Sequence, residues 1–116
     1  MKLDNWEAIS SLLQAGGAFQ HMRYEIRNNH GQLHRDDGPA VIYSNGKQEW
    51  YRNGQRHRDD GPAEVYPDGS QYWYRNGLIH RDDGPAITYS DGAQFWYLNG
   101  KRFGEDENGD PEAYFL

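Results

Sequence analysis

The hexapeptide His-Arg-Asp-Asp-Gly-Pro combines residue types that could do chemistry, and it occurs at residues 34–39, 57–62 and 80–85. Its first three residues match the catalytic loop of protein kinases, in which the aspartate accepts a proton from the substrate hydroxyl. A kinase also needs a glycine-rich phosphate loop, a lysine on a neighbouring strand and a metal-binding aspartate. The 116 residues contain no recognisable form of any of these three elements. An active site also needs one catalytic triplet, whereas this sequence has three. The hexapeptides therefore indicate architecture.

Metal binding is an alternative reading of the same hexapeptides. His34, His57 and His80 could line one edge, and imidazole with carboxylate binds zinc and other transition metals, while acidic turns hold calcium through oxygen ligands. Against this, Asp-Asp-Gly is common turn chemistry, and an arginine adjoins each aspartate pair. Arg–Asp pairs between successive blocks would satisfy both groups at a gain of roughly 0–1 kcal/mol. We predict no metal site and no cofactor, with metal binding kept as an alternative.

The hexapeptides open three blocks that align without a gap, with a period of 23 residues, at residues 34–56, 57–79 and 80–102. All three keep HRDDGPA, a tyrosine three residues later, a glycine after Asn or Asp, then Gln-x-Trp-Tyr and Asn-Gly. Residues 22–33 resemble a degenerate half block, and residues 103–116 an acidic C-terminal cap. Atypical end units are expected of stacked repeats, because they face solvent. We treat residues 1–116 as a single domain.

Each block predicts short antiparallel strands separated by turns. Asn-Gly and Asp-Gly at residues 45–46, 68–69 and 91–92 are strong hairpin signals, because both central residues of a type I′ turn have φ > 0. A second Asn-Gly follows each Trp-Tyr pair. Asp-Asp-Gly-Pro supplies a third turn, in which aspartate caps backbone amides and glycine tolerates unusual φ. We expect strands of about four to six residues in an antiparallel β-hairpin meander, each block pairing with the next.

Alternation along the strands places the aromatic residues on two faces. One face should carry a tryptophan ladder and the opposite face a tyrosine ladder, formed by Trp50, Trp73 and Trp96 and by Tyr51, Tyr74 and Tyr97. Aromatic residues make up 15% of a chain that is only 35% apolar, and rings bury large areas. We therefore expect a thin, ordered core built from aromatic rather than aliphatic side chains. The pattern leaves open which face is buried.

The N-terminal residues follow a different pattern. Asp4 and Glu7 fit a capping box, apolar residues follow at helical spacing, and Gly16 and Gly17 supply a stop. We predict a short α-helix over residues 1–17 that covers one end or face of the sheet. The expected fold class is mainly all-β, with this one helix.

Charge and composition exclude several function classes. The net charge is −6, but residues 105–112 carry five acids and no base, leaving thirteen acids against twelve bases elsewhere. This balance argues against a basic nucleic-acid footprint. No apolar run approaches the roughly 18 residues of a membrane span, and acidic residues stand where a signal peptide has its apolar segment. Without cysteine, no disulfide or thiolate metal site is possible. We expect a cytoplasmic protein without membrane association.

The period and the Tyr-x-Asn/Asp-Gly turn resemble MORN repeats over roughly residues 24–102. Tyr66, Asp68, Gly69 and Tyr72 stand where that motif has its tyrosines and its turn. This sequence departs from the MORN motif in two ways. Its Trp-Tyr-Arg-Asn-Gly segment ends two residues earlier than in the motif, and HRDDGPA replaces the usual short glycine-containing link. The resemblance implies a non-catalytic β-hairpin array used for protein association, and sometimes for membrane lipids. This variant is similar to small phage and bacterial proteins. It implies an inhibitor of a host enzyme, such as a CRISPR nuclease of antiphage defence, in the bacterial cytoplasm.

We interpret the chain as a non-enzymatic protein-binding module, because Trp, Tyr and Arg dominate interface hot spots and no nucleophile motif is present. The acids near the C-terminus would compete with phosphates for the basic surface of a host nucleic-acid enzyme. The candidate contact residues are Trp50, Trp73, Trp96, Tyr51, Tyr74, Tyr97, Arg52, Arg75, Glu105, Asp106, Glu107, Asp110 and Glu112. One alternative is a scaffold that self-associates. Another is a metal or single-stranded nucleic-acid binder, although Leu98 replaces the third arginine beside the rings and nearby acids weaken the field.

Overall fold

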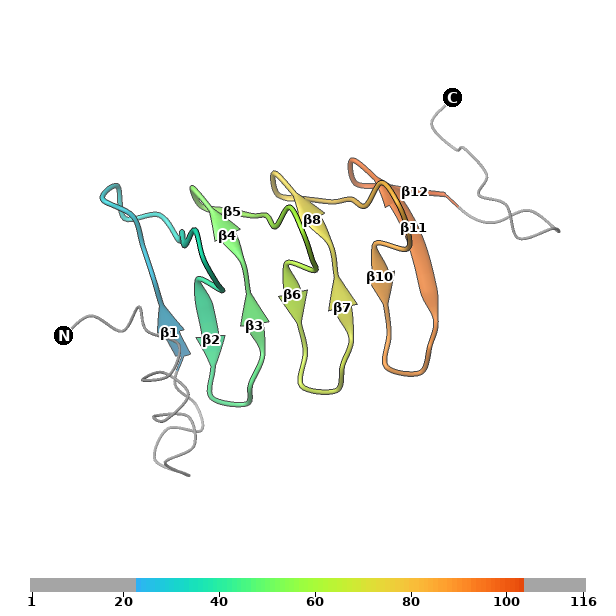
Figure 1. Cartoon of the computed structure of the whole chain (residues 1–116), viewed down its shortest axis with the longest axis horizontal. Coiled ribbons are helices and arrows are strands. Elements are labelled where there is room, and N and C mark those ends of the chain that lie inside the picture. The colour runs from blue at the N-terminus through green and yellow to red at the C-terminus, as the bar shows by residue number, and fades with distance from the viewer. Residues whose placement is uncertain (1–22, 104–116) are drawn as a thin grey trace, which may run out of the picture.

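The computed structural model describes residues 23–103, which form an antiparallel all-β structure without a helix (Figure 1). The antiparallel all-β prediction is thus confirmed for these residues, and among them no helix is long and apolar enough to cross a membrane. The helix expected over residues 1–17 and the acids of residues 105–112 lie outside the described residues. The main sheet has eight strands, in the spatial order β1 (Arg23–Glu25), β2 (Val41–Tyr43), β3 (Gln48–Glu49), β6 (Glu64–Val65), β7 (Gln71–Tyr72), β10 (Ile87–Thr88), β11 (Gln94–Leu98) and β12 (Lys101–Phe103).

Two small hairpins continue from the main sheet. They are β4 (Tyr51–Arg52) with β5 (Gln55–Arg56), and β8 (Tyr74–Arg75) with β9 (Leu78–Ile79). A single tryptophan separates each from the main sheet. The Trp50 amide donates to the Ala63 carbonyl at 2.7 Å, whereas its carbonyl accepts from the His57 amide at 3.1 Å. The backbone changes partner at this residue, so most strands are shorter than the four to six residues expected.

Two kinds of hairpin turn alternate along the chain. Asn53 and Gly54 have φ of 49° and 84°, as the predicted type I′ turn requires. At the other kind of turn, Gly46 has a φ of 96°, Asn45 is not left-handed, and the Gly46 amide donates to the Tyr43 carbonyl at 2.9 Å. This is a three-residue loop closed by a glycine bulge. The type I′ prediction is therefore wrong for residues 44–46 and their equivalents, because a side-chain oxygen of Asn45 holds the loop by accepting the amide two residues later.

The most deeply buried side chains are small or β-branched aliphatic ones, not aromatic rings. They are Ala40, Val41, Ile42, Ala63 and Ala86, each at most 1% exposed. The tryptophan and tyrosine ladders are only half-buried. The expectation of an aromatic core is therefore wrong at the deepest positions. A single sheet encloses small side chains fully, but it leaves one side of a large ring open unless another layer covers it.

Candidate functional site

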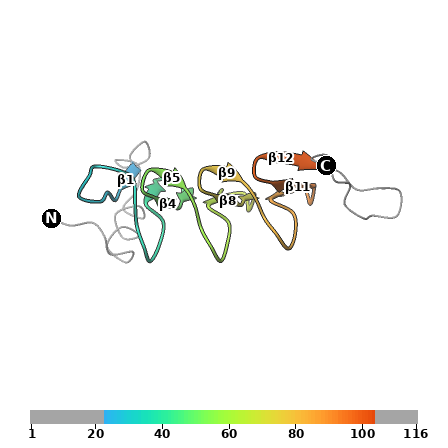
Figure 2. The same cartoon turned by 90° about the horizontal axis from the view of Figure 1, so that it is seen from above.

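The register places the predicted aromatic residues on two opposite faces of the sheet. We call the face with Trp50, Trp73 and Trp96 the turn face, because the three hexapeptide turns project from the sheet on that side (Figure 2). We call the other face, with Tyr51, Tyr74 and Tyr97, the tyrosine face. Each face brings together side chains from successive blocks. The two ladders therefore belong to two separate candidate surfaces.

A histidine holds each hexapeptide turn in place on the turn face, buried at His57 and His80 and half-buried at His34. His57 Nδ1 accepts the Asn76 amide at 3.0 Å, so its Nε2 carries the proton and donates to Asp59 at 2.7 Å. His34 and His80 make the equivalent contacts. Each ring thus joins the start of its block to the Asn-Gly turn that closes the same block. The sequence suggests that the turn aspartates cap backbone amides. The first aspartate of each turn instead binds the histidine side chain.

The arginine of the hexapeptide lies beneath its own turn. The Arg58 guanidinium carbon stands 4.1 Å from the centre of the Trp50 ring, and its Nη1 donates to the Pro62 carbonyl at 3.1 Å. A Cβ added to Gly61 would lie 2.8 Å from that guanidinium carbon. Gly61 does not have positive φ, so glycine is needed here for close approach and not for the unusual φ expected. Equivalent contacts occur at Gly38 and Gly84.

The second arginine set joins one block to the next. Arg52 Nη2 lies 2.6 Å from Asp59, and Arg75 pairs with Asp82 in the same way. The hydrogen bond from His57 and that from Arg52 lower the pKa of Asp59, and the equivalent groups lower that of Asp82. The predicted contact residues Arg52 and Arg75 therefore already have partners within the sheet.

Two grooves lie between successive hexapeptide turns. The first, of about 760 Å³, is lined by Trp50 and by the turns at residues 35–39 and 57–60. The second, of about 440 Å³, is lined by Trp73 and by the turns at residues 58–60 and 80–83. Asp59 and Asp60 line both grooves. The turn face thus offers two adjacent sites of the same construction, with tryptophan in each and aspartates on both walls.

The charges of this face are arranged in layers. The six turn aspartates project, with side chains 68–90% exposed. The hexapeptide arginines lie below them, with side chains only 9–29% exposed. Arg52 and Arg75 also line the grooves, with side chains 49% and 44% exposed, so the carboxylates are the most exposed charges of a face on which acids and bases nearly balance in number. Opposite charges arranged in this way favour a cationic partner over an anionic one.

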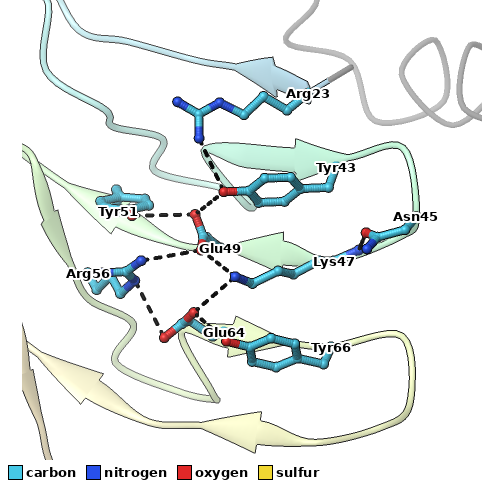
Figure 3. Close-up of polar contacts among 9 residues, drawn as sticks. All are labelled: Arg23, Tyr43, Asn45, Lys47, Glu49, Tyr51, Arg56, Glu64 and Tyr66. Atoms are coloured by element: carbon cyan, nitrogen blue, oxygen red, sulfur yellow. Dashed lines mark hydrogen bonds and ion pairs between the residues drawn. The ribbon is translucent and has the colours of Figure 1, made fainter. Parts of the chain in front are cut away.

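The tyrosine face holds an ion cluster that the sequence analysis missed (Figure 3). Lys47 Nζ lies 3.0 Å from Glu49 and 3.5 Å from Glu64, and Arg56 lies 3.4 and 3.5 Å from the same two carboxylates. The glutamate side chains are only 3% and 6% exposed. Burial alone would raise the pKa of Glu49, but Lys47 and Arg56 lower it. Antiparallel pairing of Glu49 with Glu64 brings them together, a register that spacing along one strand does not reveal.

A line of rings continues from this cluster along the tyrosine face. Tyr66, Tyr72, Tyr89 and Phe95 follow at centroid distances of 5.4, 6.0 and 5.5 Å. Burial, together with hydrogen bonding and charge from Tyr89, raises the pKa of Tyr72 to about 12. Tyr51 and Tyr74 lie beside the ion cluster, each with the Arg56 guanidinium over its ring. These rings link the blocks across the sheet.

Within residues 23–103, no group of three or more His, Asp or Glu side chains is placed to hold a metal ion. The ring nitrogens of His34, His57 and His80 already have hydrogen-bond partners. The paired aspartates of each turn point to separate partners. The geometry of the turns therefore gives the metal-binding alternative no support.

Comparison with protein-family models, with curated proteins and with solved structures finds no match for this chain.

Proposed function

We propose that this protein is a non-enzymatic binding module that holds a protein partner on its turn face. The observation that carries the proposal is the pair of adjacent grooves, each with a half-buried tryptophan between walls of projecting aspartates. Tryptophan and arginine are over-represented among the residues that dominate binding energy in protein interfaces. The carboxylates would guide a basic surface towards them and fix its orientation. The parts of the two rings that the packed arginines leave exposed would then provide apolar area to bury.

The chemistry of the turns supports a binding role over a catalytic one. A general base needs a nitrogen or oxygen free to take a proton from a substrate. His34, His57 and His80 are instead hydrogen-bonded at both ring nitrogens and hold the backbone in shape. The hexapeptides thus build the walls of the grooves.

The resemblance to MORN-like repeats and to small phage proteins suggests what the partner is. A host nucleic-acid enzyme of antiphage defence has a basic surface of the kind that the turn aspartates would match. Occupying that surface would block the enzyme by excluding its nucleic acid.

A charge reversal at the shared wall of the grooves tests the proposal. The tagged full chain would be used to capture its partner from bacterial lysate, and the affinity for the isolated partner would then be measured. Asp60→Lys should weaken that affinity about tenfold or more, which corresponds to about 1.4 kcal/mol. Asp91→Lys, the matched control, makes the same change in an exposed hairpin turn outside the grooves. Equal affinity of the two variants for the partner would refute the assignment to the turn face.

A further inference from the structure

The repetition of the grooves restricts which partner segment fits them. Both grooves use the same residue types, and both are built from consecutive blocks of one continuous sheet. The first two blocks each add two strands to that sheet, and neighbouring strands are about 4.8 Å apart. The grooves therefore recur about every 9.6 Å along the sheet. A ligand that fills both needs two like groups with that separation.

We propose that the grooves bind an extended, cationic segment of a partner protein that carries a basic residue at every third position. This inference rests on the proposed function and names the partner segment. In a polyproline II conformation the rise is about 3.1 Å per residue with three residues per turn. Every third side chain then points the same way, about 9.3 Å from the last. That repeat matches the groove spacing to within a few tenths of an ångström.

The charge layering selects cations for this role. The segment would cross the crests of the turns, where the aspartate side chains are most exposed. Each of its arginines would enter one groove between two pairs of carboxylates, above the hexapeptide arginine that packs on the tryptophan. Arginine suits this position because it pairs with carboxylates in a bidentate manner. A polyanion such as single-stranded nucleic acid would meet the carboxylates first and be repelled.

Synthetic peptides test the spacing directly on the full-length protein. One peptide repeats Arg-Pro-Pro, and its isomer has the same composition with all arginines consecutive. At low ionic strength, calorimetric titration should show that the spaced peptide binds about tenfold more tightly than the isomer. Its affinity should fall steeply with added salt, because exposed charges are screened within about 10 Å at 0.1 M.

Two variants locate the binding. Asp60→Asn removes one carboxylate shared by both grooves, and its side chain is 90% exposed with a single arginine contact at 3.4 Å. It should weaken the spaced peptide about threefold to fivefold, the effect of losing one exposed ion pair. Asp91→Asn makes the same change outside the grooves and reproduces the residue type found at Asn45. It should leave the affinity unchanged.

The outcomes separate this inference from the proposed function. Equal binding of the two isomers, no binding of either, or an Asp60→Asn affinity equal to that of Asp91→Asn would overturn the spaced cationic segment. Tighter binding of a neutral oligosaccharide or of oligothymidylate would overturn it as well. In each case, a weakened affinity of the Asp60→Lys variant for the captured protein partner would still support protein binding on the turn face.

Discussion

Replacing Lys47 by methionine tests whether the buried ion cluster holds the first two blocks together. Methionine keeps most of the lysine stem but removes the ammonium that lies between Glu49 and Glu64. That ammonium also stands 5.2 and 4.6 Å from the ring centres of Tyr43 and Tyr66. The substitution leaves the two nearly buried carboxylates with Arg56 as the remaining cation of the cluster.

The size of the effect follows from these contacts. Removing one partner of a fully buried ion pair costs about 3–5 kcal/mol, because the other charge is left uncompensated. Lys47 is partly exposed and Arg56 stays within 3.5 Å of both glutamates, so the loss should be smaller. Lost ring contacts add about 0.5 kcal/mol each. We expect the free energy of unfolding to fall by about 2–3 kcal/mol, and Tm by roughly 10 °C or more.

The effect should also depend on pH. The ion pairs give Glu49 a lower pKa in the folded protein than its ordinary value of 4.5. The stability they provide is therefore complete above that ordinary value, and it is lost as the pH falls through the folded pKa. The difference in the free energy of unfolding between wild type and Lys47→Met should therefore become smaller as the pH falls through this range. Urea unfolding followed by tryptophan fluorescence at several pH values measures both quantities.

A matched variant guards against a general effect of lost positive charge. Lys101→Met makes the same change at an exposed position of β12 and should alter stability by less than about 0.5 kcal/mol. If Lys47→Met unfolds at the same urea concentration as Lys101→Met, the cluster does not stabilise the pairing of the blocks. A gap that stays constant at acidic pH would contradict the electrostatic explanation.

Two further substitutions test the turns. Gly61→Ala should lower the free energy of unfolding by about 1–2 kcal/mol, because the new methyl group pushes the Arg58 guanidinium off Trp50 and away from its carbonyl acceptor. Thermal unfolding measures this loss. If Gly61→Ala is equally costly in an Arg58→Met background, the explanation is wrong. Asn76→Ala should cost about 1 kcal/mol, since φ is 51° there and alanine lacks the short polar side chain that lets asparagine tolerate the left-handed region. Asn76→Gly should be close to neutral in the same unfolding measurement, and equal losses for the two variants would show that the side chain of Asn76, not its φ, is responsible.

The local features of this protein could be read from its sequence because they depend on neighbouring residues. Asn53 and Gly54 form the predicted type I′ turn, since positive φ at two successive positions is a local requirement. Strand alternation likewise separates Trp50 from Tyr51, because it depends only on the two-residue period. The antiparallel all-β arrangement follows from these turns and strands.

Only the tertiary structure decided which side chains share an environment. Glu49 and Glu64 meet because β3 and β6 pair in one register, and nothing in their spacing along the chain requires it. The sequence suggested that Gly61 is required for an unusual φ. In the structure, glycine leaves room for the Arg58 guanidinium, which lies beneath the turn. The grooves between the turns exist because the sheet stacks successive blocks side by side, and the aspartates face outwards because the arginines occupy the space below. Contacts of this kind depend on register and packing between distant segments, so they are absent from any local pattern of residues.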